Sequence, residues 1–133
     1  MTSLTLTLSI MPGTFAICRV DAGAAIPRWA LRGSFVSLTR TADELSIVCP
    51  QGDVPEGMQC SRGWRCLRVA GPLDLSLTGV LASLTAPLAR ARISLFAISS
   101  FNTDYLLVQE KDLEEALVAL SAAGHNARQE WQS

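Results

Sequence analysis

Side chains that commonly perform chemistry are scarce in this chain. It has one histidine, His125, and four cysteines, Cys18, Cys49, Cys60 and Cys66, and no two cysteines are spaced as a C-x-x-C pair. Zinc sites usually show paired, closely spaced ligands. The spacing therefore favours reduced, mostly buried thiols in a cytosolic protein, with a disulfide or a metal site as the alternative.

The sequence also lacks the usual marks of an enzyme. A catalytic site needs a nucleophile with a base and an orienting group, and no Gly-x-Ser-x-Gly motif, P-loop or dinucleotide fingerprint is present. The single lysine, Lys111, stands at the start of a helical pattern, on a face expected to be solvated. His125 follows Gly124 at a helix end, where a solvated or capping side chain is expected. We therefore expect no catalysis, no metal and no cofactor.

Length and charge limit the remaining classes of function. The chain has 133 residues, of which 49% are hydrophobic and 17% charged, so it can fill the core of one domain or of two very small ones. A net charge of -1 provides no basic field for a nucleic acid backbone. In the N-terminal segment apolar and polar residues alternate, and no basic region is present. We therefore interpret it as a strand and not as a signal peptide. No apolar run approaches the roughly 20 residues of a membrane span, so we expect a cytoplasmic protein.

A β-hairpin at Ile93 to Val108 is the strongest structural signal in the chain. Two apolar runs are joined there by a short polar break, Ser99 to Asp104. Helical patterns lie on both sides of it, at Leu77 to Ala91 and at Asp112 to Ala123. Pro87 falls inside the first of these helices and should bend it or shorten its last turn. Asp74 or Ser76 can cap its start.

Short strands and turns make up the rest of the predicted structure. Strands are expected at Leu4 to Ile10, Thr14 to Val20, Phe35 to Arg40, Leu45 to Val48, Trp64 to Val69 and Asn126 to Trp131, with a helical turn at Ile26 to Leu31 and a loop at Pro50 to Gly63. The second half then reads β-α-β-β-α with a last strand, and the first half reads as a reduced version of it. We therefore place an N-terminal unit at residues 1–62 and a C-terminal unit at residues 63–133.

Apolar side chains occupy both faces of the first strand of the hairpin. Helices on one side cover only one face of a sheet. The other face must therefore be covered by the other half of the chain, by a partner subunit, or by both. We expect a homodimer.

Three stretches resemble a known family. Ser37 to Pro50 (SLTRTADELSIVCP), Gly63 to Leu84 (GWRCLRVAGPLDLSLTGVLASL) and Leu95 to Val108 (LFAISSFNTDYLLV) look like the small bacterial proteins built from tandem ACT domains. That group is related to the ACT modules of aspartate kinases and of the CASTOR-type arginine sensors. The resemblance implies an α+β fold of two ferredoxin-like β-α-β-β-α-β units in tandem, with antiparallel sheets and helices on one face.

The resemblance also implies a binding site for a small ligand, usually an amino acid, at the interface between paired units. Its residues come from the turn before the first helix and from the hairpin turn: Gly71, Asp74, Leu77, Thr78, Gly79, Ile98, Ser99, Ser100, Asn102 and Asp104. Free N–H groups at Leu77 to Gly79 suit a carboxylate, and the two aspartates suit an amino group. Asn102 stands where relatives carry an aspartate, which points less strongly to a cationic ligand.

Each of these residues also has a purely structural explanation. Asp74 is either a helix cap or a ligand contact, and Asp104 either stabilises the hairpin turn or binds the ligand. The glycines either punctuate the backbone or allow a ligand to approach it. Two functions are considered first: a regulatory module that binds an amino acid between ACT-like units, or an interaction protein with the same fold and no metabolite ligand. An enzyme of unknown class is the third alternative.

Overall fold

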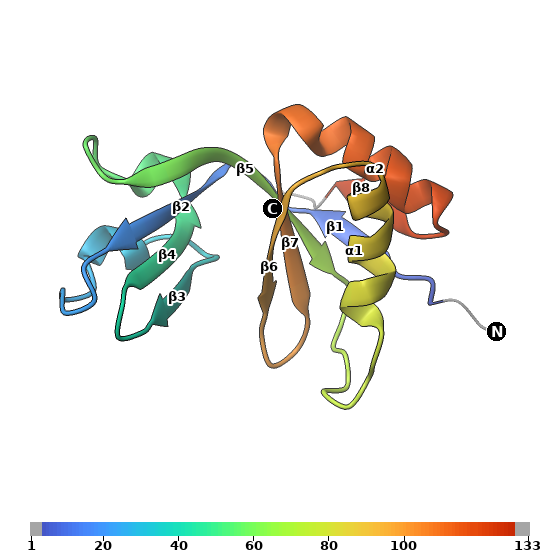
Figure 1. The fold of residues 1–133 in the computed structure, drawn as a ribbon, viewed down its shortest axis with the longest axis horizontal. Coiled ribbons are helices and arrows are strands. Elements are labelled where there is room, and N and C mark those ends of the chain that lie inside the picture. Colours follow the sequence, from blue (N-terminus) through green and yellow to red (C-terminus); the bar gives the residue numbers. More distant parts are fainter. Residues whose placement is uncertain (1–3, 130–133) are drawn as a thin grey trace. The chain divides into compact units, whose positions relative to one another are not determined.

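The computed structural model describes residues 4–129 and divides into two compact units (Figure 1). The larger unit comprises residues 4–12 and 65–129, and the inserted unit comprises residues 13–64. The sequence suggested a single division after residue 62. In the structure residues 4–12 group instead with the C-terminal residues, because the first strand pairs with strands from that part of the chain.

The larger unit contains a ferredoxin-like arrangement of strands and helices. In chain order it consists of β1 (Thr7–Ile10), residues 65–69 of β5 (Cys60–Val69), α1 (Val80–Arg90), β6 (Leu95–Ser99), β7 (Asp104–Gln109), a 3-10 turn (Glu110–Asp112), α2 (Leu113–Ala122) and β8 (Asn126–Gln129). From β5 onward the order is β-α-β-β-α-β, which confirms the predicted fold. The expected last strand continued to Trp131, which lies outside the described residues.

The sheet of the larger unit is mixed, whereas an antiparallel sheet was expected. Its order is β6-β7-β5-β1-β8. β1 pairs antiparallel with β5 and parallel with β8, in the registers Leu8 to Val69 and Leu8 to Ala127. The additional strand β1 thus lies between the first and last strands of the β-α-β-β-α-β unit. This position requires one parallel pair, because β5 and β8 run in opposite directions.

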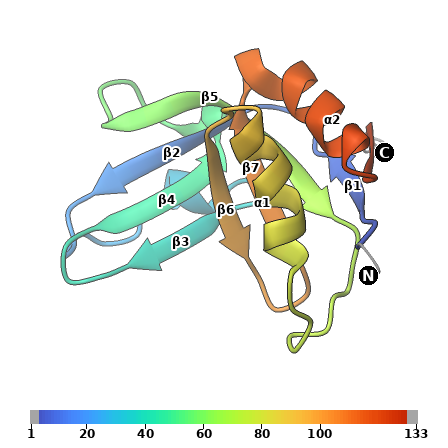
Figure 2. The same ribbon diagram turned by 45° about the vertical axis from the view of Figure 1, so that its right-hand side comes forward.

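Both helices cover the same face of this sheet, as expected (Figure 2). Alternate residues of three strands point toward the helices and are buried with one stripe from each helix: Leu8, Ile10, Leu67, Val69, Leu106, Val108, Val80, Leu84, Leu88, Ala116 and Leu120. Within residues 4–129, no helix has the length and apolar character needed to span a bilayer.

Pro87 lies inside α1, and the helix continues past it to Arg90. A proline has no N–H, so the carbonyl of Ser83, four residues earlier, lacks its helical partner. The ring nitrogen Nε2 of His125 lies 2.9 Å from that carbonyl oxygen, and Nδ1 of His125 accepts the N–H of Leu6 at 3.1 Å. His125 is therefore buried and bonded at both nitrogens, so the expectation of a solvated side chain or of a cap on the preceding helix α2 is wrong.

The inserted unit is a four-stranded arrangement with the order β3-β4-β2-β5. It contains β2 (Phe15–Val20), β3 (Ser37–Arg40), β4 (Leu45–Pro50), residues 60–64 of β5, and two 3-10 helices, Arg28–Leu31 and Gln51–Asp53. Its predicted strands are confirmed, and the loop after β4 is shorter than expected because β5 already begins at Cys60. Residues 13–64 contain no α-helix, so a tandem repeat of the ferredoxin-like unit stays a prediction.

Candidate functional site

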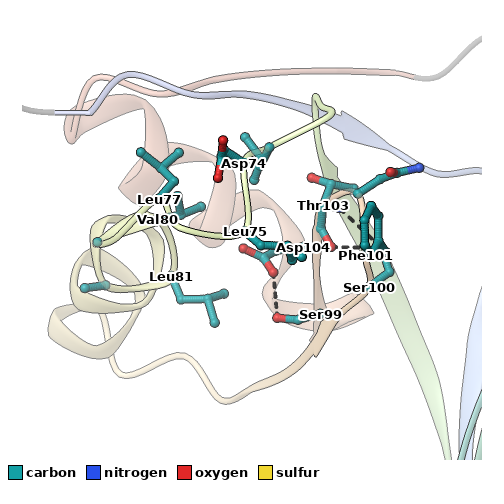
Figure 3. Close-up of a pocket in the computed structure, with 14 residues that line it drawn as sticks. Asp74, Leu75, Leu77, Val80, Leu81, Ser99, Ser100, Phe101, Thr103 and Asp104 are labelled. Atoms are coloured by element: carbon teal, nitrogen blue, oxygen red, sulfur yellow. Dashed lines mark hydrogen bonds between the residues drawn. The ribbon is translucent and has the colours of Figure 1, made fainter.

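A pocket of about 360 Å³ opens in the larger unit, where the loop before α1 meets the β6–β7 turn (Figure 3). Figures 1 and 2 both show this loop and this turn at the same end of the unit. The first turn of α1 forms a further wall. The lining residues are Leu73, Asp74, Leu75, Leu77, Gly79, Val80, Leu81, Ala82, Ser99, Ser100, Phe101, Asn102, Thr103 and Asp104.

Most residues proposed from the sequence come together in this one pocket. Those that line it are Asp74, Leu77, Gly79, Ser99, Ser100, Asn102 and Asp104, whereas Gly71, Thr78 and Ile98 do not. Sequence reasoning missed the first turn of α1 and the apolar residues of the two turns. One signal could have identified the apolar residues: Leu75 and Phe101 are large apolar side chains within otherwise polar turns.

Backbone bonds hold the two turns together. The N–H of Leu73 donates to the carbonyl of Asn102 at 2.6 Å. The hydroxyl of the buried Thr103 donates to the carbonyl of Val69 at 2.6 Å. A Cβ on Gly71 would lie 3.1 Å from both the Asn102 carbonyl oxygen and the Thr103 Cβ. Gly71 therefore allows the turns to approach each other, but it does not line the pocket.

Hydrogen bonds within the hairpin turn orient its polar side chains. The N–H of Ser100 donates to the Thr103 carbonyl at 2.8 Å, and its hydroxyl donates to the same oxygen at 3.0 Å. The Ser99 hydroxyl donates to Oδ1 of Asp104 at 2.6 Å, a bond drawn in Figure 3. Asp104 thus stabilises the turn and also presents a carboxylate to the pocket.

Asp74 stabilises its own turn and does not cap α1. Its Oδ1 accepts the N–H of Ser76 at 2.8 Å and the Ser76 hydroxyl at 2.7 Å. These bonds, the backbone N–H first, hold the pKa of the Asp74 carboxyl below its usual range. The expectation that Asp74 or Ser76 caps the helix is wrong, because α1 begins only at Val80.

The start of α1 provides free donors a few residues later than predicted. Gly79 is the N-cap with φ of 80°, in the left-handed region that favours glycine, and no side chain caps the helix. The N–H groups of Val80, Leu81 and Ala82 therefore lack helical partners. The N–H of Leu77, in contrast, already donates to the Asp74 carbonyl at 3.0 Å.

The pocket combines opposite electrostatic features. Asp74 and Asp104 bring two carboxylates, and the lining includes no basic side chain. The N-terminus of α1 carries the positive end of the helix dipole. Large apolar side chains surround these polar groups, since Leu75 is 69% exposed and Phe101 is 78% exposed.

Such an arrangement suits a small molecule with a cationic and an anionic group. Catalysis is not indicated by the lining, which holds hydroxyls and carboxylates without a histidine or lysine. Among residues 4–129, no group of three or more His, Cys, Asp or Glu side chains is placed to hold a metal ion.

Family comparison places the pocket within a recognised domain. The model of the ACT domain matches residues 59–122, which contain the whole lining. A second model, described as an N-terminal domain, matches residues 13–57, within the inserted unit.

Individual proteins are similar to the whole chain or to part of it. The chain is 40% identical to a crystallised Agrobacterium tumefaciens protein, Atu0741, covering 98% of this chain and 97% of that one with a TM-score of 0.92. It is 40% identical over 58 residues to human cytosolic arginine sensor for mTORC1 subunit 1; this is 43% of the chain but only 18% of the sensor's length.

A more distant structure shows the same fold. The regulatory subunit of aspartate kinase from Thermus thermophilus has a TM-score of 0.58 at 12% identity, covering 92% of this chain and 99% of that one. The family assignment therefore extends to residues 59–122, which match the ACT domain.

Proposed function

We propose that this protein is a regulatory module that binds an amino acid in the pocket of its larger unit. The observation that carries the proposal is the presence, in one pocket, of an uncapped helix N-terminus and two carboxylates. A free amino acid carries a carboxylate and an ammonium group a short distance apart, so both of its charged ends find complementary partners there.

The proposed pose follows from the positions of these groups. The ligand carboxylate accepts hydrogen bonds from the N–H groups of Val80 to Ala82, and the ammonium group lies against Asp104, with Asp74 nearby. The bonds described above use only Oδ1 of each aspartate. The ligand side chain then lies among Leu75 and Phe101.

A second copy of the chain is part of this proposal. β6, which among the described residues pairs only with β7, is an edge strand of the larger unit. Edge strands expose unpaired backbone groups that another strand can extend. The protein then acts in the cytoplasm as a homodimer, and the pocket lies near the contact between the two copies. Such a contact would cover the apolar side chains of Leu75 and Phe101, which are exposed in the single chain.

The same apolar rim favours an alternative function. Leu75, Leu77 and Phe101 are exposed around one pocket, and exposed apolar groups of this kind often mark a protein contact. The protein would then be an interaction module that keeps the ACT fold and binds no metabolite.

Thermal-shift measurements against the twenty amino acids distinguish the two functions. A ligand that binds the native state raises the melting temperature by an amount set by its concentration relative to Kd. We expect a shift with at least one amino acid at millimolar concentration, and no shift with any of them contradicts the amino-acid function.

Charge-removing variants then locate the site. Asp104→Asn keeps an acceptor for Ser99 but removes the charge, and we expect it to abolish the shift; Asp74→Asn should reduce it. Asp21→Asn, at an exposed position of the inserted unit, is the matched control and should leave the shift unchanged. A shift that survives in both pocket variants means that the ligand binds elsewhere.

A further inference from the structure

Three of the four cysteines gather in the inserted unit. Cys18 on β2 and Cys49 on β4 are buried in its core, and Cys60 on β5 packs against that core while remaining partly exposed. Cys18 and Cys60 are direct partners in the antiparallel pairing of β2 with β5. Cys66 belongs to the larger unit.

The backbone hydrogen bonds show which kind of antiparallel pair Cys18 and Cys60 form. The N–H of Arg19 donates to the carbonyl of Gln59 at 3.0 Å, which joins the residues that flank Cys18 and Cys60. In an antiparallel ladder, such a bond marks the enclosed pair as a non-hydrogen-bonded pair, whose Cα atoms lie roughly 4.5 Å apart. Disulfides bridge Cα separations of roughly 4.4–6.8 Å. The backbone of the two strands therefore already permits a bridge.

The thiols themselves are in contact but differ in their access to solvent. Burial, the neighbouring thiols of Cys60 and Cys49, and a hydrogen bond with Cys60 raise the pKa of Cys18 to about 12. Burial, followed by the nearby Asp53 carboxylate, raises the pKa of Cys49 to about 11. Cys18 and Cys49 therefore remain protonated near neutral pH, and Cys60 is the thiol of this group that a dissolved oxidant reaches first.

We propose that Cys18 and Cys60 form a cross-strand disulfide when the folded protein meets a peroxide. The site belongs to the inserted unit, whereas the pocket residues belong to the larger unit, so the proposal does not depend on the proposed ligand. The bridge joins β2 to β5 without a change in their register.

The chemistry proceeds in two balanced steps. The sulfur of Cys60 attacks one peroxide oxygen; an S–O bond forms, the O–O bond breaks, and one water leaves, which yields a sulfenic acid. The sulfur of Cys18 then attacks the sulfur of Cys60; the S–S bond forms, the S–O bond breaks, and the hydroxyl leaves as a second water with the Cys18 proton. Two thiols lose two electrons and two protons, and hydrogen peroxide is reduced to two waters.

Peptide mapping of the oxidised wild-type chain tests the proposal. The folded protein is treated with hydrogen peroxide, its remaining thiols are blocked with iodoacetamide under denaturing conditions, and the digest is analysed without reduction. We expect a linked peptide that contains Cys18 and Cys60 and disappears on reduction, with Cys49 and Cys66 recovered in the alkylated form.

Variants sharpen the assignment. Cys49→Ala and the control Cys66→Ala should both retain the linked peptide, whereas Cys60→Ser should leave Cys18 as a free thiol under the same treatment. A link between Cys18 and Cys49 overturns the proposal. So does recovery of Cys60 as a sulfinic acid with Cys18 still reduced. The two contradicting outcomes, a link between Cys18 and Cys49 and a sulfinic acid at Cys60, are both measured on the wild-type chain. They therefore do not depend on the folding of any variant.

Discussion

His125 joins three segments of the larger unit through a single ring. Because Nδ1 accepts the N–H of Leu6, the proton of the neutral ring must be on Nε2, which can then donate to the carbonyl of Ser83. That carbonyl needs a donor because Pro87 has none. His125 therefore has a structural role: its ring supplies the hydrogen-bond donor that Pro87 cannot supply to the Ser83 carbonyl.

Removal of this ring should destabilise the protein. In His125→Ala, the Leu6 N–H and the Ser83 carbonyl both lose their partner, and each unpaired buried group costs about 1–3 kcal/mol. Pro87→Ala restores an N–H four residues after Ser83, so the double variant should recover about 1 kcal/mol relative to the sum of the single variants. Urea denaturation of the four proteins measures this coupling; strictly additive losses contradict the explanation.

The turn at Asp74 leads to a prediction about pH. The folded pKa of Asp74 lies below its usual value because Ser76 donates to the carboxylate, first through its backbone and then through its hydroxyl. A depressed pKa stabilises the fold above the unfolded-state pKa, and this contribution is lost as the pH falls through the folded value. Ser76→Ala removes the hydroxyl bond alone and should raise the NMR titration midpoint of Asp74. An unchanged midpoint assigns the shift to the backbone bond only.

Among the elements, the loop before α1 and the hairpin turn form one structural piece. The bonds from Leu73 to Asn102 and from Thr103 to Val69 join them, and the absence of a side chain at Gly71 allows the contact. The pocket exists because these segments, distant in sequence, are held against each other.

A methyl group at Gly71 should therefore separate the two turns. Its Cβ would meet a carbonyl oxygen and a side-chain carbon at 3.1 Å, and overpacking of this kind costs about 1–3 kcal/mol. We expect Gly71→Ala to lower stability in urea denaturation and to weaken any ligand-induced thermal shift. Gly23→Ala is the matched control, because a Cβ there meets nothing within 4 Å; equal losses in both variants refute the packing argument.

The local elements could be predicted from the sequence because their signals are local. Alternating apolar residues fixed the strands, and the hairpin at Leu95–Ser99 and Asp104–Gln109 lies within the stretch where it was expected. The start of α1 was placed too early because Asp74 and Ser76 look like caps. Gly79, in the left-handed conformation, sets the true start, and a conformation of this kind is not specified by residue type alone.

The parallel pairing of β1 with β8 could not be predicted, because the two strands are separated by nearly the whole chain. The pocket residues were located through family resemblance, which supplied the long-range relation between the two turns. Val80 to Ala82 were missed because the helix start was misplaced.

At the scale of the whole molecule, the inserted unit lies in the sequence between the additional strand β1 and β5, the first strand of the ferredoxin-like unit. The insertion occurs where these strands would otherwise form a hairpin, since Ile10 pairs with Leu67 and the N–H of Met11 donates to the Cys66 carbonyl at 2.9 Å. Continuation of that register sets Pro12 opposite Arg65.

Excision of the inserted unit should therefore leave a foldable domain. Replacement of residues 13–64 by Asn-Gly leaves a four-residue loop, Pro12-Asn-Gly-Arg65, between the hydrogen-bonded pair Met11 and Cys66, and four-residue loops are a common hairpin connection. We expect cooperative thermal unfolding and well-dispersed NMR signals. The same variant carrying Leu8→Asp, which places a charge in the core, is the negative control; a non-cooperative transition in the parent variant shows that the larger unit depends on the insertion.

The position of β1 also affects how the protein is made. β1 is synthesised before both of its partner strands, because β5 ends after the inserted unit and β8 follows α2. Until β5 has been synthesised, the apolar residues Leu6, Leu8 and Ile10 thus have no strand of their own unit to join. The inserted unit can meanwhile complete its own strands. A nascent chain of this design keeps an apolar segment without its partner strands until β5 and then β8 have been made, so we expect its yield in cells to depend on chaperones that bind such segments.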